Sequence, residues 1–163
     1  MASPFAGRYT ARTDEPRVLF LVGMRVNKLI LPHKWLPVFF AMPPMLMELK
    51  RRPEAGMLSQ RTYVSGRIIL VQQYWESFDK LVAYAHAADA AHFPAWAAFN
   101  RAVGKDGTVG IWHETYLIEP GKYECIYANM PRFGLAKAAR HALAEGTLAA
   151  ARDRIAPETP GGG

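Results

Sequence analysis

Val109-Gly-Ile-Trp-His-Glu-Thr-Tyr-Leu-Ile118 is the stretch that decides the fold of this 163-residue chain. It is rich in β-branched and aromatic residues, which is typical of a strand. Glu119-Pro-Gly-Lys122 follows it, and proline and glycine favour the second and third positions of a type II turn. Because a second β-rich run, Tyr123-Glu-Cys-Ile-Tyr-Ala-Asn-Met130, comes next, the sequence predicts a hairpin that turns at Pro120 and Gly121.

The register of that hairpin determines which side chains share a face. Successive strand residues point to opposite sides of a sheet, so Trp112 and Tyr116 lie on one face and His113 on the other. Directly opposed residues share a face, which places Asn129 with Trp112 and Ala128 with His113. Trp112 and His113 therefore cannot both face one pocket, and the small partner Ala128 favours His113.

The rest of the chain predicts strands and helices in an α+β order. Pro37, Pro43 and Pro44 each remove an amide donor, so no continuous helix is expected around them. The expected elements are a strand over 17–26, a broken helical region over 32–52, strands over 57–64 and 67–75, a helix from Ser77 towards His92, a helix over 95–103, the hairpin, and an alanine-rich helix over 135–155.

The order of the first six elements matches the ferredoxin-like arrangement, and a C-terminal strand and helix are extra. Ferredoxin-like helices cover one sheet face, whereas the strand over 17–26 is apolar on both faces. A second copy of the sheet would cover the other face. The predicted fold class is therefore α+β, a ferredoxin-like dimeric α+β barrel, and the expected partner is a second copy of the chain.

Composition predicts one globular domain in the cytoplasm. Half of the residues are hydrophobic and 21% are charged, which excludes a disordered chain. No run is long enough to cross a membrane and the N-terminus lacks an apolar signal segment, so no membrane partner is expected. We expect residues 1–16 to form a polar lead-in, 17–156 the domain and 157–163 a disordered tail.

Charge and cysteine content exclude several classes of partner. The net charge is +6, but the one tight basic cluster, Lys50-Arg51-Arg52, lies where a helix would end and where cations are favourable. No nucleic-acid-binding motif accompanies it, so no nucleic-acid partner is expected. Cys125 is the single cysteine, which excludes an internal disulfide and a cysteine-based zinc site.

Two histidines are candidates for chemistry. His92 returns to the apolar face of the helix that starts at Ser77, and Phe93 and Trp96 supply aromatic neighbours. A buried neutral imidazole beside a flat aromatic cavity suits either haem iron or an apolar organic substrate. The commoner role of such a histidine is a hydrogen-bonded core residue. His113 lies on the neighbouring predicted strand. Nucleotide-binding loops and the hydrolase nucleophile elbow are absent from the sequence.

Four runs of the sequence resemble a known family. They are Val22-Gly-Met-Arg-Val-Asn27, His92-Phe-Pro-Ala-Trp-Ala-Ala-Phe-Asn100, Gly110-Ile-Trp-His-Glu-Thr-Tyr116 and Tyr127-Ala-Asn-Met-Pro131. Over residues 8–140 the chain resembles the small family named after the fumagillin-pathway monooxygenase, within the group of antibiotic-biosynthesis monooxygenases. That group forms dimeric α+β barrels, and some members oxidise polycyclic or polyene substrates with O₂ and no cofactor.

Other barrels of the same kind bind haem, so the resemblance makes haem the suspected cofactor. In the haem-degrading branch an axial histidine on the second helix follows a Tyr-Trp strand end, and Tyr74-Trp75 and His92 are similarly spaced here. The resemblance implies a monooxygenase-like oxidoreductase that holds haem or an apolar organic substrate between sheet and helices. The alternative is a non-enzymatic haem or lipophile-binding protein of the same fold.

The predicted site combines catalytic and cofactor-binding side chains. His113 would exchange protons near neutral pH, and Asn129 would orient bound oxygen. His92 would ligate haem iron or, without haem, anchor the substrate. The complete predicted set is His113, Asn129 and Tyr116 as catalytic residues, with His92, Trp96, Trp75 and Trp112 around the cofactor.

Overall fold

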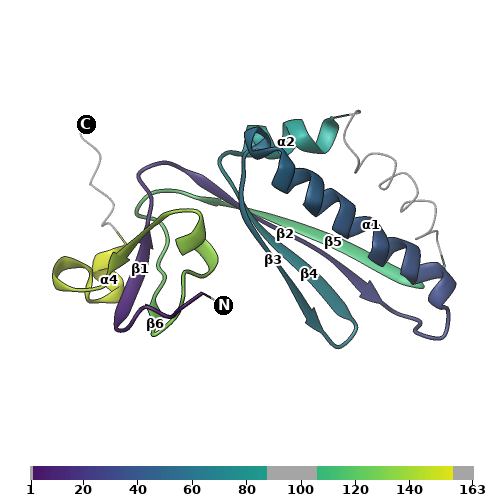
Figure 1. Cartoon of the computed structure of the whole chain (residues 1–163), viewed down its shortest axis with the longest axis horizontal. Helices are drawn as coiled ribbons and strands as arrows, with labels where there is room; N and C mark the ends of the chain where they lie inside the picture. The colour runs from purple at the N-terminus through teal and green to yellow at the C-terminus, as the bar shows by residue number, and fades with distance from the viewer. Residues whose placement is uncertain (1, 88–105, 156–163) are drawn as a thin grey trace, which may run out of the picture. The chain divides into compact units, whose positions relative to one another are not determined.

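The computed structural model describes residues 2–87 and 106–155 (Figure 1). The chain divides into two compact units, where a single domain over 17–156 was expected. Unit 1 comprises Met1–Arg17 and Leu117–Gly163, and unit 2 comprises Val18–Tyr116. The helix expected over 95–103 and the tail expected over 157–163 lie outside the described residues.

Unit 2 contains a four-stranded antiparallel sheet in the order β3-β4-β2-β5. Its elements in chain order are β2 (Arg17–Val26), α1 (Pro32–Arg51), β3 (Met57–Ser65), β4 (Ile68–Trp75), α2 (Phe78–His86) and β5 (Val109–Ile118). Figure 1 shows α1 running along one face of this sheet. The element order and strand order together are those of the ferredoxin-like α+β fold, so the predicted fold class is confirmed.

The helix-facing side of the sheet carries the core of unit 2. The β2–β4 register pairs Val18 with Trp75 and Val22 with Val71, and paired residues share a face. Trp75 is fully buried and packs with Val18, Leu49 and Leu81 from the strands and helices. Its indole Nε1 donates to Gln73 Oε1 at 2.9 Å, which satisfies the buried donor.

Helix α1 is continuous from Pro32 to Arg51, so the prediction that its prolines break it is wrong. A proline inside a helix costs about 3 kcal/mol. Pro37, Pro43 and Pro44 are all exposed, so carbonyls left without an amide donor can bond water. The burial of the apolar inner face against the sheet offsets the remaining cost.

Helix α2 begins as the sequence predicts. Ser77 is its N-cap and accepts a hydrogen bond from the Lys80 amide at 3.2 Å, and Asp79 lies in the first turn. The helix ends at His86, with Ala87 as its C-cap. His92 lies outside the described residues, so its predicted place on this helix stays a prediction.

The predicted strand over 109–118 and the turn after it are present, but the hairpin is not. Gly121 has a φ of 77°, and the Lys122 amide donates to the Glu119 carbonyl at 3.0 Å. Of the run predicted to form the second strand, 123–130, only Tyr127–Ala128 forms a strand, β6, and it pairs with β1 (Arg8–Arg12) in another sheet. Two-residue hairpins favour type I′ or II′ turns, because a type II turn splays the strands that it joins.

Unit 1 is built on a second sheet in the order β6-β1-β7, with β7 over Arg140–Leu143. Because β1 is the central strand of this sheet, Arg8–Arg12 belongs to a folded unit and not to a polar lead-in outside the domain. The alanine-rich helix expected over 135–155 is also wrong. That segment forms η2 (Gly134–Lys137), β7, η3 (Gly146–Leu148) and the short helix α4 (Ala151–Arg154). The interruption expected at Gly146 is present, since this residue has a φ of 56°, but pairing of β7 with β1 overrides the helix propensity of alanine before it.

A buried arginine holds the C-terminal part of unit 1. Arg154 is 3% exposed and donates to Glu124 Oε1 at 2.7 Å. It also donates to the carbonyls of Leu148 and Ala149 at 2.8 and 2.9 Å. These bonds compensate the desolvation of the guanidinium and connect the segment of Glu124 to α4.

Gly23 in β2 allows Trp112 in β5 to lie close to the sheet. A Cβ at this position would stand 2.8 Å from two ring atoms of Trp112 and 3.0 Å from the Ile69 carbonyl oxygen. We expect Gly23→Ala to lower the free energy of unfolding by about 1–3 kcal/mol, measured by urea denaturation. Gly110→Ala is the matched control, because its new Cβ would meet Asn27 at 3.7 Å, an ordinary contact. Equal effects of the two variants would contradict this account.

His141 in β7 is expected to make unit 1 sensitive to acid. Its ring stacks on Tyr9 at a centroid distance of 4.4 Å, and Phe5 meets its edge at 4.9 Å. Nε2 is buried and has no hydrogen-bond partner among the described residues. Burial and the nearby charge of Arg132 lower the pKa of His141.

The unfolded chain therefore binds a proton at His141 more readily than the folded chain. Stability should fall as the pH drops below the ordinary histidine pKa of about 6.5, because the unfolded state then binds more protons. His141→Phe should flatten this slope in urea denaturation at stepped pH, whereas the exposed His33→Gln should leave it unchanged. An unchanged slope in His141→Phe would show that other groups cause the dependence.

Candidate functional site

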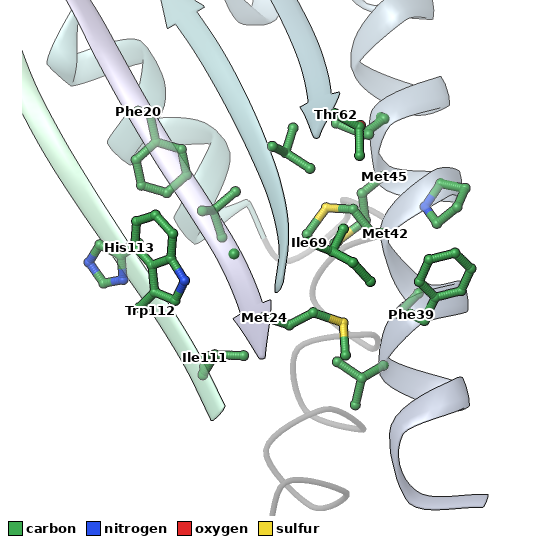
Figure 2. A pocket seen from close by; sticks show the side chains of 17 residues that line it. Phe20, Met24, Phe39, Met42, Met45, Thr62, Ile69, Ile111, Trp112 and His113 are labelled. Carbon is green, nitrogen blue, oxygen red and sulfur yellow. The ribbon is translucent and has the colours of Figure 1, made fainter. Parts of the chain in front are cut away.

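A cavity of about 270 Å³ lies between the sheet of unit 2 and helix α1 (Figure 2). All four strands and α1 contribute to its wall. The lining residues are Phe20, Val22, Gly23, Met24, Val38, Phe39, Ala41, Met42, Pro43, Met45, Leu46, Thr62, Ile69, Val71, Ile111, Trp112 and His113. No lining residue carries a permanent charge, so the cavity suits an apolar molecule with few polar groups.

The wall of the cavity that α1 forms includes flexible side chains. Val38, Met42 and Met45 recur every three or four residues and therefore share one face of α1. Met24 faces Met42 and Met45 from β2, as Figure 2 shows. Thioether side chains are flexible and polarisable, so this wall can adapt to ligands of different shape.

The polar groups of the cavity come from two strands. Thr62 in β3 supplies a hydroxyl, and β5 supplies the imidazole of His113 and the indole of Trp112 (Figure 2). The centroids of the His113 and Phe20 rings lie 5.8 Å apart, so His113 belongs to the helix-facing side. His113 is exposed, so it lies where the cavity meets solvent and can exchange protons with water.

Trp112 also borders the cavity, although strand parity excluded it together with His113. The indole lies against Gly23, which is the position on β2 that has no side chain. Because nothing stands between them, the ring reaches the cavity across the neighbouring strand. Both β5 residues therefore contribute to the wall, from opposite sides of their strand.

Tyr116 and Trp75 do not line the cavity. The Tyr116 hydroxyl donates to Glu114 Oε2 at 2.6 Å, and this hydrogen bond to a carboxylate raises the pKa of the phenol. Its side chain is half-exposed. Trp75 is a fully buried core residue, which leaves no described surface of its ring for a ligand.

Asn129 lies in unit 1, directly after β6, and its polar groups bond to Gly7. It has a φ of 53°, and Asn is one of the few residues that adopt this conformation readily. The backbone amide of Asn129 donates to the Gly7 carbonyl at 2.9 Å. Its side-chain Oδ1 accepts a hydrogen bond from the Gly7 backbone amide, also at 2.9 Å. These bonds give Asn129 a local structural role. His92 and Trp96 lie outside the described residues, so their predicted roles stay predictions.

Sequence reasoning did not single out Thr62 or the residues of β4 at the base of the cavity. The β3–β4 register pairs Thr62 with Val71, so both share the helix-facing side. This parity was available from the predicted strands over 57–64 and 67–75. The sequence did not show where along those strands the cavity lies, because that depends on where α1 crosses the sheet.

The described lining does not fit haem. His113 and the thioethers of Met24, Met42 and Met45 are the described lining groups that could ligate iron, but no arginine or lysine is among the described lining residues to pair with two propionate carboxylates. Buried carboxylates without cations are costly. In the described part of the chain, no group of three or more His, Cys, Asp and Glu side chains could hold a metal ion. No described helix has the length and hydropathy needed to cross a membrane.

The chain is similar to known proteins both in sequence and in structure. Monooxygenase af470 of Aspergillus fumigatus is 29% identical over 86 residues, which cover 50% of this chain and 30% of that protein. The match thus spans less than a third of the length of this relative.

Two solved structures illustrate the structural likeness. A dimeric ferredoxin-like protein from an uncultured marine organism has a TM-score of 0.46 and 12% identity, over 64% of this chain and 96% of that chain. SnoaB, a cofactor-independent oxygenase from Streptomyces nogalater, has a TM-score of 0.40 and 15% identity, over 61% of this chain and 90% of that chain.

The family model described as Monooxygenase af470-like matches residues 17–135, which contain every residue that lines the cavity. This match covers most of the chain. The chain belongs to the Monooxygenase af470-like family.

Proposed function

We propose that unit 2 binds an apolar organic molecule in the cavity beneath α1 and oxidises it with O₂. The observation that carries this proposal is the apolar cavity itself, with an imidazole at its solvent-facing edge. Family membership supports a monooxygenase-like function. SnoaB, a cofactor-independent oxygenase, gives a precedent for such a reaction without haem.

The proposed reaction is balanced without an external reductant. A substrate methylene activated by neighbouring unsaturated groups would react as R₂CH₂ + O₂ → R₂C=O + H₂O. One oxygen atom enters the substrate and the other leaves as water, and the substrate supplies the electrons. Such a carbon must first lose a proton, and an imidazole near neutral pH is suited to accept it.

His113 is the residue to which we assign the proton transfer. It lines the cavity and is exposed, so a proton taken from the substrate can pass to bulk water. Trp112, Phe20 and the methionines of α1 would hold the rings of the substrate. Thr62 would offer a hydrogen bond to a substrate oxygen.

We also propose that the protein acts as a homodimer. The sheet face opposite α1 carries Leu19, Leu21 and Leu70, which lie on the Gly23 side of the β2–β4 register. A second sheet would remove these side chains from water. The cytoplasmic location inferred from the sequence stays a prediction.

Filling the cavity should weaken ligand binding. Ala41 lines the cavity from α1, so Ala41→Phe would place a ring in the space meant for the ligand. We expect the affinity for a fluorescent apolar probe to fall about tenfold or more, since each tenfold loss needs only about 1.4 kcal/mol. Ala83→Phe, exposed on α2, is the matched control and should bind the probe normally. Unchanged binding by Ala41→Phe would place the ligand elsewhere.

Removal of the imidazole should slow oxidation more than it weakens binding. His113→Gln is expected to lower kcat about 10²–10⁴-fold, the usual contribution of a general base, with a much smaller effect on the affinity for the substrate. O₂ consumption with a panel of enolisable polycyclic compounds measures this effect. His86→Gln is the control, because His86 bonds the Val82 carbonyl on α2.

The panel also separates the enzyme from its alternative. A lipophile carrier would bind the probe through the cavity but consume no O₂ with any compound, and His113→Gln would not alter it. Full activity in His113→Gln would show that another group accepts the proton.

A further inference from the structure

We propose that the outer face of α1 docks on an anionic lipid bilayer. The face in question is a stripe of exposed residues that recur every three or four positions and therefore share one side of the helix. We call it the outer stripe. It consists of His33, Pro37, Phe40, Pro44, Met47 and Arg51.

The middle of the outer stripe is apolar and exposed to water. Phe40 is 62% exposed and Met47 is 51% exposed, although both belong to a long, well-formed helix. No charged residue occurs from Trp35 to Met47. The inner side of the same helix is already buried against the sheet, so the outer stripe is a second apolar face. Such contiguous exposed patches mark interaction sites.

The loop before α1 extends the apolar surface. Ile30 is 87% exposed and Leu29 is 49% exposed, immediately before the first helical residue, Pro32. These aliphatic side chains enlarge the apolar area that a bilayer interface could bury, and binding to an interface grows with that area.

Charges at both ends of α1 favour an anionic surface. Lys28 is exposed before the helix, where its ammonium keeps its charge and donates to the Asp106 carbonyl at 3.2 Å, and Lys50 and Arg51 are exposed in the last turn. No Asp or Glu occurs between Glu15 and Glu48 in the sequence. Basic residues that flank an apolar helix face are attracted to the negative potential of acidic lipids. Lys34 is different, since it forms an ion pair with Asp106.

The same charges argue against a second copy of the chain on this face. Two outer stripes could pair in parallel or antiparallel orientation, and either orientation would bring cationic ends together. Like charges in contact oppose association. The sequence predicted no membrane partner because no segment is long enough to cross a bilayer. A helix that lies in the bilayer interface does not need to be that long.

Vesicle sedimentation of the full chain tests the proposal. The probes are phosphatidylcholine vesicles with and without phosphatidylserine. We expect binding to the vesicles that contain phosphatidylserine, weaker binding without it, and weaker binding at high salt. Binding is measured without turnover, so the result is independent of the proposed oxidation.

Two variants and a control sharpen the test. Phe40→Ser combined with Met47→Ser should lower the partition coefficient about tenfold or more. Lys50→Gln combined with Arg51→Gln changes only exposed side chains and should lower it about fivefold for each charge removed. Leu117→Ser removes an equally exposed apolar side chain, 65% exposed, from β5 and should bind as the parent does.

Three results would overturn the proposal. One is failure of the parent protein to bind vesicles that contain phosphatidylserine. Another is unchanged binding in both double variants. The last is self-association of the parent protein in place of vesicle binding. Light scattering would then show an oligomer that dissociates in the Phe40→Ser, Met47→Ser variant, which would assign the outer stripe to self-association.

Discussion

The packing of α1 across one face of the four-stranded sheet is the contact on which unit 2 depends. Val38 and Leu49 of α1 are buried against residues of β2, β4 and β5. Burial of an aliphatic side chain contributes about 1.5–3 kcal/mol, so several such contacts offset the hydrogen bonds that the internal prolines remove. The helix is therefore held by tertiary contacts more than by its own backbone.

The cavity is a consequence of how this helix meets the sheet. Two core clusters, one around Trp75 and one around Met24, fix the helix towards its two ends. Between them lie Met42, Pro43 and Met45, whose side chains leave space unfilled. Protein interiors are otherwise close-packed, so an apolar void kept open between two clusters indicates a use for the space.

Local signals in the sequence predicted much of unit 2 and little of unit 1. The strands of unit 2, the Ser77 cap and, in unit 1, the turn at Gly121 follow from periodicity and residue type, and the structure contains all three. The pairing of β6 with β1 could not be read locally, because Arg8–Arg12 and Tyr127–Ala128 are distant in sequence. The site residues, too, could be predicted where local sequence signals sufficed and not where long-range packing decides. His113 and Trp112 were found from their strand, whereas the α1 wall depended on where a helix thought to be broken crosses the sheet.

The ambiguity of α1 in the sequence has a physical basis. An amphipathic helix alternates apolar and polar faces, whereas a helix that is apolar all round belongs in a core or against lipid. From Trp35 to Met47 no charge marks which side faces water, so periodicity alone could not orient the helix. The sheet covers one side in the structure, and Phe40 remains exposed on the other. A single helix thus borders the cavity with its inner side and carries the apolar surface on its outer side, so whatever covers the outer side also lies one helix diameter from the cavity.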